Sequence, residues 1–158
     1  RPKRTTEQLL AASGHLHYEV NMFDATGRTL ASGIFGQGAA TNAFLESFTI
    51  HLRSLLYFLY STAPKPDDVI AEDFFDNPAT WVTVRGKLPA SLEAVNRRVG
   101  KEIAHLTYAR LEVTPDTKGW NIPDIWAALL PIVQKFAQNA RPECLGPPWR
   151  LPTQKPEA

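Results

Sequence analysis

The chain has 158 residues, a length that fits one domain comfortably and two only with difficulty. Apolar residues make up 44% of it, enough for a core that needs neither disulfides nor a structural metal, and the single cysteine excludes a disulfide framework and a cysteine-rich zinc site. With 17 basic and 16 acidic residues, the net charge of +1 argues against a broad electrostatic nucleic-acid binder. No apolar run approaches the roughly 20 residues that span a bilayer, and the first residues do not resemble a signal peptide. We therefore expect a cytoplasmic domain with no membrane contact.

Helical periodicity dominates the first half of the chain. Apolar side chains at spacings of three, four and seven predict a helix over residues 6–31. The next stretch predicts a second helix, with Thr41 or Asn42 as its N-cap. Its apolar stripe consists of Leu45, Phe48, Leu52, Leu55 and Leu59.

The middle of the chain is less regular. Residues 68–75 predict a short helix, whereas residues 81–84 alternate like a strand but have no other strand to pair with, so we expect a loop there. A third long helix is predicted with Ser91 as its N-cap. Its apolar stripe consists of Leu92, Val95, Val99, Ile103 and Leu106.

A fourth helix is predicted to begin near Asn121, with Pro131 marking either a kink or a junction between two shorter helices. Prolines are frequent after Arg141, so residues 141–158 read as a Pro-rich tail, although its apolar side chains would allow it to dock on the body. These elements predict an all-α fold, an antiparallel bundle of four to five helices over residues 1–140.

One pair of side chains on the third predicted helix is a candidate for catalysis. Arg98 and His105 are seven residues apart, which places them on one helical face about 10 Å apart along the axis. An antiparallel second copy would bring Arg and His of opposite chains together. Lys101 flanks the same face, and Arg110 is either a second phosphate contact or a cap of the helix C-terminus.

Such a site would suit cleavage of an RNA backbone. A histidine exchanges the proton of a ribose hydroxyl near neutral pH, and an arginine stabilises the charge that develops on phosphate oxygens, without a metal or a cofactor. The structural alternative is an ordinary i, i+4 ion pair between Arg98 and Glu102.

Polar side chains on the second predicted helix offer further candidates. Glu46 and Arg53 share a face, and His51 lies on an adjoining strip. These three would line the same cleft as Arg98 and His105, or else form a solvated flank or an ion-pair bridge between helices.

The stretch from Arg98 to His105, Arg-Val-Gly-Lys-Glu-Ile-Ala-His, resembles the Arg-x(4–6)-His signature of the HEPN superfamily, the higher-eukaryote and prokaryote nucleotide-binding domain. Residues 42–59 are also similar to the second helix of bacterial abortive-infection and related HEPN-like proteins, so the resemblance covers about residues 5–140. It implies a helical bundle that forms a homodimer and cleaves RNA without metal, as a toxin or phage-defence effector with an antitoxin or another operon-encoded partner. By the same resemblance, His105 would be the catalytic base or acid, and Arg98 the phosphate clamp.

A second hypothesis comes from the same family, in which some members have lost the site and serve as protein-interaction or nucleotide-binding modules. The family usually carries a polar residue directly after the motif arginine, where this chain has Val99. That departure and the balanced charge favour the silent module, whereas the intact Arg–His pair favours the ribonuclease.

Overall fold

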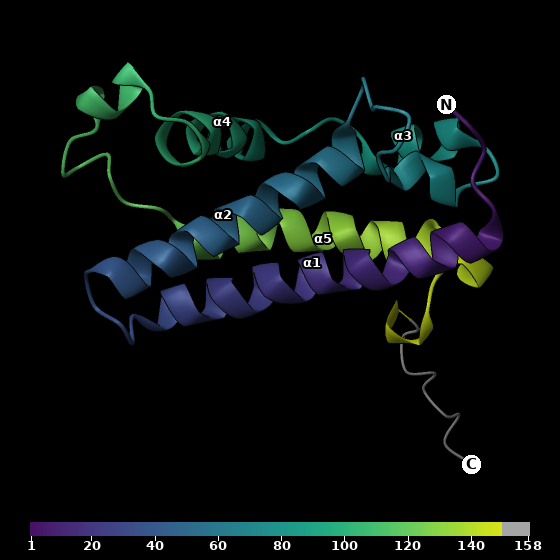
Figure 1. Ribbon diagram of the computed structural model, residues 1–158, viewed down its shortest axis with the longest axis horizontal. Coiled ribbons are helices and arrows are strands. Elements are labelled where there is room, and N and C mark those ends of the chain that lie inside the picture. The colour runs from purple at the N-terminus through teal and green to yellow at the C-terminus, as the bar shows by residue number, and fades with distance from the viewer. Residues whose placement is uncertain (150–158) are drawn as a thin grey trace, which may run out of the picture.

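The computed structural model describes residues 1–149, which contain helices and loops but no strand (Figure 1). The predicted all-α bundle is therefore confirmed. Its α-helices are α1 (Thr6–Ser32), α2 (Ala39–Tyr60), α3 (Pro78–Arg85), α4 (Ala90–Val99) and α5 (Ile122–Asn139). Helix α5 packs against α1, α3 and α4, and α2 packs against α1 and α4. No helix within residues 1–149 combines the length and the apolar character needed to cross a bilayer.

Helix α1 begins where the periodicity predicts. Thr5 and Gln8 form a capping box: Thr5 Oγ1 accepts from the main-chain N–H of Gln8, and Gln8 Oε1 accepts from that of Thr5. The helix ends at Gly33, which adopts the left-handed conformation with φ of 65°. The predicted helix over residues 6–31 is thus confirmed.

Helix α2 begins earlier than its expected cap. It starts after Gly38, with no side chain capping its first turn, so the prediction of Thr41 or Asn42 as N-cap is wrong. The Thr41 hydroxyl instead donates to the carbonyl of Gly36, outside the helix. The apolar stripe is buried as predicted except at Leu45, which is only partly covered.

Helices α1 and α2 form an antiparallel hairpin that runs the length of the molecule (Figure 1). Phe23 and Phe48 stack across it with ring centroids 4.7 Å apart. Gly27 allows the close approach, because a Cβ atom there would lie 3.0 Å from the Phe48 ring. The close packing of α1 against α2 at this point therefore depends on glycine at position 27, opposite Phe48.

Helix α3 occupies the stretch for which we expected a loop, so that prediction is wrong. Asn77 caps the helix by accepting from the N–H of Ala79, and Pro78 occupies the first turn, where its fixed φ suits a helix. The Trp81 side chain is fully buried against the body of the protein. Tertiary packing thus stabilises a helix of eight residues that would be marginal alone. Residues 68–75, predicted as a short helix, contain only the 3₁₀ turn Ala71–Phe74.

Helix α4 is shorter than predicted. It begins at Ala90 after Pro89 with no side-chain cap, so the assignment of Ser91 as N-cap is wrong. It ends at Val99, and a π-helical turn follows over Gly100–Ala104. Leu106, which we placed on the core stripe, lies beyond this turn and is exposed, because the 3.6-residue period no longer applies there.

Helix α5 begins as predicted after Asn121, whose Oδ1 accepts from the N–H of Asp124. It is one helix through Pro131, so the alternative of a junction between two helices is wrong. Pro131 and Ala127, one turn before it, are both exposed, so water can satisfy the carbonyl that Pro131 leaves without a donor.

The first part of the tail docks on the body. Cys144 and Leu145 are buried, and Ser13 of α1 holds the segment through two bonds. Its Oγ accepts from the N–H of Gly146 at 3.0 Å, and its carbonyl accepts from Trp149 Nε1 at 2.9 Å. The rest of the predicted tail, residues 150–158, lies outside the described residues.

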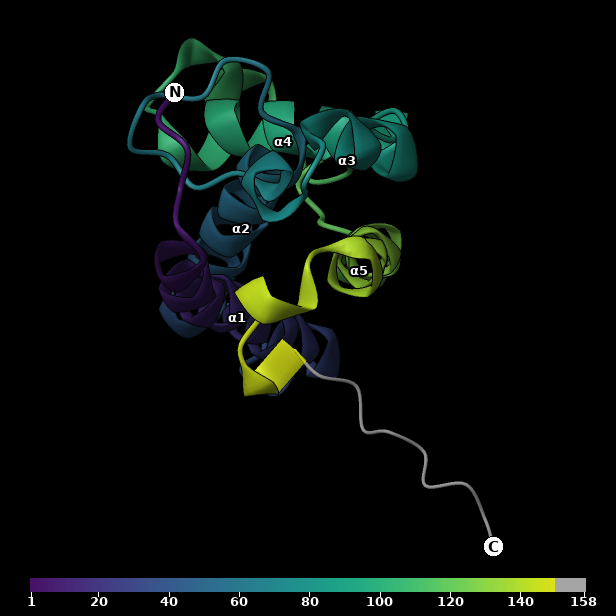
Figure 2. The same cartoon turned by 90° about the vertical axis from the view of Figure 1, so that its right-hand side faces the viewer.

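Phe136 of α5 is at the centre of the core. Its ring lies 5.0 to 6.2 Å from five other aromatic rings, mostly edge to face. These rings belong to Phe58, Phe74, Phe75, Trp81 and Trp149. Viewed from the end of the bundle, α3 lies above α5, and α2 and the docked tail lie to its left (Figure 2).

Substitution of Trp81 tests the contact between α3 and α2. Its Nε1 donates to the carbonyl of Leu59 at 2.9 Å, and that carbonyl is one of the last four of α2, which lack a partner within the helix. We expect Trp81→Phe to lower the free energy of unfolding by about 1–3 kcal/mol in urea titrations, because the buried carbonyl loses its donor. Val82→Ala, a change on the exposed side of the same helix, should cost less than about 0.5 kcal/mol. Equal losses in the two variants would contradict this account.

Candidate functional site

Arg98 and His105 do not share a helical face, so this part of the sequence prediction is wrong. The turn between them, Gly100–Ala104, is a π-helix, which has more residues per turn than an α-helix. His105 follows it in an extended conformation, with φ of −128° and ψ of 145°. The rotation of 100° per residue therefore stops applying before His105 is reached.

Arg98 is bound within its own subunit. Its Nε donates to the carboxylate of Glu102 at 2.8 Å, which is the i, i+4 pair that we considered as the structural alternative. Its Nη atoms donate at 2.7 to 3.0 Å to three successive main-chain carbonyl groups, those of Thr117, Lys118 and Gly119. Arg98 thus connects α4 to a loop about twenty residues further along the chain.

The guanidinium of Arg98 also stacks on Trp120, with its central carbon 4.0 Å from the ring centroid. These contacts use four of the five N–H groups of the side chain. Arg98 lines a groove of about 470 Å³ between α4 and the beginning of α5, together with Trp120 and Asp124, and His105 is not among its lining residues. In the single chain, the two proposed catalytic residues do not meet in this groove.

The residues that follow the π-helical turn, 105–112, form what we call the exposed segment. Two side-chain bonds attach it to the turn: the Thr107 hydroxyl donates to the carbonyl of Lys101, and Arg110 Nη2 donates to that of Ile103. Arg110 therefore caps the end of the helical region, which was the structural role considered for it. The Lys101 side chain is exposed.

Large apolar side chains on the exposed segment are open to solvent. Leu106 and Tyr108 are each 90% exposed, and Leu111 is 83% exposed. His105, next to Leu106, is also exposed. Three such side chains within six residues make an apolar surface of a kind that marks interaction sites on monomeric proteins.

The candidates on α2 do not line one cleft. His51 faces α1, where its Nδ1 lies 2.8 Å from Oε2 of Glu19. Arg53 points toward the π-helical turn, because a Cβ atom at Gly100 would lie 4.0 Å from its Nη1. Glu46 is exposed. The contact between His51 and Glu19 joins α1 and α2, as the bridge considered for this strip would do, but the sequence carries no signal for Glu19 because it is 32 residues away.

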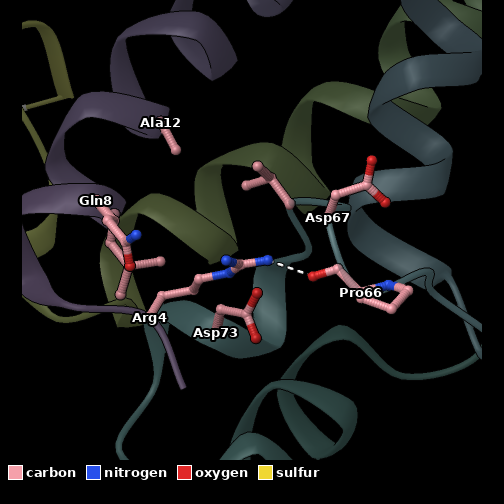
Figure 3. Close-up of a pocket in the computed structure, with 8 residues that line it drawn as sticks. Arg4, Gln8, Ala12, Pro66, Asp67 and Asp73 are labelled. Carbon is pink, nitrogen blue, oxygen red and sulfur yellow. Dashed lines mark hydrogen bonds between the residues drawn. The ribbon is translucent and has the colours of Figure 1, made fainter. Parts of the chain in front are cut away.

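A separate pocket of about 370 Å³ lies between the start of α1 and the loop before the Ala71–Phe74 turn (Figure 3). Gln8 and Ala12 of α1 line one side, and Asp67 and Asp73 line the other. The Arg4 guanidinium crosses the pocket and donates to the carbonyl of Pro66. No motif or periodic pattern in the sequence marks these residues as a binding site.

The loop beside this pocket is held by Asp68. Its Oδ2 accepts from the hydroxyl of Tyr57 and from the N–H of Lys65, each at 2.5 Å. These two bonds, the Tyr57 bond most of all, hold the pKa of the Asp68 carboxyl below its ordinary value of 3.8. Folding is therefore favoured by this carboxylate above about pH 4, and that contribution is lost as the pH falls through the lowered pKa.

Within residues 1–149, no three His, Cys, Asp or Glu side chains lie close enough together to bind a metal ion.

The single cysteine, Cys144, is buried. Burial raises the pKa of its thiol, so the thiol is protonated near neutral pH.

Comparison with models of protein families, with curated proteins and with solved structures gave no match. The function must therefore be argued from the geometry of this chain.

Removal of the Tyr57 hydroxyl tests the contact that lowers the pKa of Asp68. We expect Tyr57→Phe to raise this pKa toward 3.8, as followed by carboxyl ¹³C chemical shifts in an NMR titration, since the strongest donor to the carboxylate is lost. Tyr18→Phe, which changes an exposed tyrosine on α1, should leave the pKa unchanged. An unaltered Asp68 pKa in Tyr57→Phe would show that the hydroxyl does not bond to it.

Proposed function

We propose that this chain is a self-associating interaction module, and that the exposed segment is the contact surface between two copies. The observation that carries the proposal is the exposure of Leu106, Tyr108 and Leu111, at 83–90% each. Burying a leucine or an aromatic side chain of this kind favours association by about 1.5–3 kcal/mol. Tyrosine is also among the residues most enriched at the energetic centres of interfaces.

Charge on the same surface favours a second copy over RNA or an anionic membrane. Lys101 and Arg110 carry positive charge, and Glu112 and Asp116 carry negative charge. None of the four takes part in an ion pair within residues 1–149. In a two-fold contact the same patch meets itself, so each basic group can face an acidic group of the other copy. The four charges cancel, so this part of the chain offers no net positive charge to attract a polyanion or an anionic lipid.

The engagement of Arg98 supports the module over a catalytic role for that residue. A phosphate clamp needs free N–H groups, and four of the five are committed to Glu102 and to main-chain carbonyls. The neighbouring Glu102 carboxylate also neutralises the charge that would attract a phosphate. The proposal thus corresponds to the silent HEPN-like module of the second hypothesis.

An endoribonuclease of HEPN type is the second candidate function, and one observation favours it. His105 is exposed within the proposed contact surface, so a two-fold contact there would place both copies of His105 in the same interface. Lys101 and Arg110, rather than Arg98, would then supply the positive charge for a phosphate. A toxin or phage-defence role with an antitoxin partner belongs to this second candidate.

The dimer is tested by truncation of the exposed segment. We expect the purified protein to be a dimer in sedimentation and light-scattering measurements. Tyr108→Ala should raise the dissociation constant of the dimer by roughly 30-fold or more, because the loss of a central aromatic contact costs about 2 kcal/mol. Val82→Ala is the control, since Val82 is 45% exposed on α3, which lies at the opposite end of the molecule from this segment (Figure 1). A wild-type protein that stays monomeric at every concentration would contradict the proposal.

The second candidate has its own assay. If it holds, the wild-type protein cleaves single-stranded RNA in the presence of EDTA, and His105→Ala loses activity by about 10²-fold or more because the proton-transfer group is gone. His15→Ala, at an exposed histidine of α1, should retain full activity. Equal cleavage by the wild type and His105→Ala, both folded, would exclude His105 as the catalytic group.

A further inference from the structure

We infer that Arg98 is the positioning residue that fixes the path of residues 105–119, and thereby presents the exposed segment in one conformation. The effect on self-association rests on the proposed function. The fixing of the loop itself does not, because it follows from the contacts of Arg98 within one chain.

The contacts of Arg98 join both ends of this loop. Glu102 belongs to the π-helical turn from which the loop departs, and the three bonded carbonyls, at residues 117–119, belong to the stretch by which it returns to α5. Arg98 itself lies in α4, which packs against α2 and α5. One side chain therefore connects the start of the loop, its end and the body of the bundle.

The loop has little else to hold it. Residues 105–112 contain no fully buried side chain, and their bonds to the π-helical turn come from Thr107 and Arg110 at its near end. At the far end, Thr114 and Thr117 bond to each other rather than to the bundle. A segment without a buried apolar anchor opens easily unless polar contacts fix it, so the Arg98 bonds carry a large share of its order.

The geometry requires arginine rather than lysine. The three nitrogens of one planar group reach three carbonyls and one carboxylate, while its face covers Trp120 at 4.0 Å. An ammonium has three donors on a single atom and cannot reach all these acceptors at once. Arg98→Lys therefore retains the positive charge and removes the planar guanidinium with its several N–H donors.

The neighbouring Arg97 provides a matched control. It has the same side chain one residue earlier on α4, but it is mostly exposed and its nearest carboxylate, that of Glu93, is 3.6 Å away. Arg97→Lys changes the same chemical group without touching the loop.

The experiment compares these two variants by hydrogen–deuterium exchange and mass spectrometry. We expect Arg98→Lys to speed exchange in peptides covering residues 105–119 by about tenfold or more, with peptides of α1 and α5 unchanged, because only local opening becomes easier. Arg97→Lys should match the wild type throughout. The emission of Trp120, isolated as the difference from Trp120→Phe, should also shift in Arg98→Lys, since the guanidinium leaves its ring.

The outcomes separate this inference from the proposed dimer. Unchanged exchange at 105–119 in Arg98→Lys overturns the inference, even if the protein is a dimer. Faster exchange throughout α1 and α5 also overturns it, because the effect would then be global rather than confined to the loop. Faster exchange confined to 105–119 in a protein that is monomeric supports the role of Arg98 and rejects the dimer. If the protein is a dimer, Arg98→Lys should also raise its dissociation constant, and the rise should follow the loss of exchange protection at residues 105–119.

Discussion

The packing of Phe136 against five aromatic rings is the interaction on which the rest of this structure depends. Those rings come from α2, from the segment around Ala71–Phe74, from α3 and from the start of the tail. Elements far apart in sequence thus share one buried centre, and the short ones owe their place to it. Helix α3 illustrates this dependence, because eight residues do not form a stable helix in water without such packing. The docked Pro142–Trp149 segment is held the same way, with Trp149 adding its ring to the cluster.

The other end of the bundle is organised by polar contacts instead. Beyond Val99 the chain leaves the helical period, and no apolar side chain of the exposed segment returns to the core. Arg98 binds the loop carbonyls directly, and Thr107 and Arg110 add bonds to the π-helical turn. The cost of this arrangement is that large apolar side chains remain in water, since no residue within 1–149 covers them. A contact surface explains why a folded protein would keep them there.

The resemblance to HEPN proteins implies a helical bundle, and the structure is an all-α bundle. The same resemblance implies that Arg98 binds phosphate, whereas its observed partners are a carboxylate, three carbonyls and an indole ring. His105 is affected less, since it stays exposed and is free to meet a substrate or a second copy. The two residues of the motif therefore have separate surroundings: Arg98 is bonded to a loop, and His105 lies at the surface.

The long helices α1, α2 and α5 and most of their buried faces can be predicted from the sequence, because hydrophobic periodicity and capping residues such as Thr5 and Asn121 act locally. Three further features depend on contacts between distant parts of the chain. Helix α3 forms because Trp81 fits a buried site built by distant elements, and α4 gives way to a π-helical turn that separates Arg98 from His105. Arg98 and His51 find their partners 21 and 32 residues away in the sequence. Periodicity describes which face of a helix is buried, but it carries no information on where that helix stops or on what a polar side chain meets across the fold.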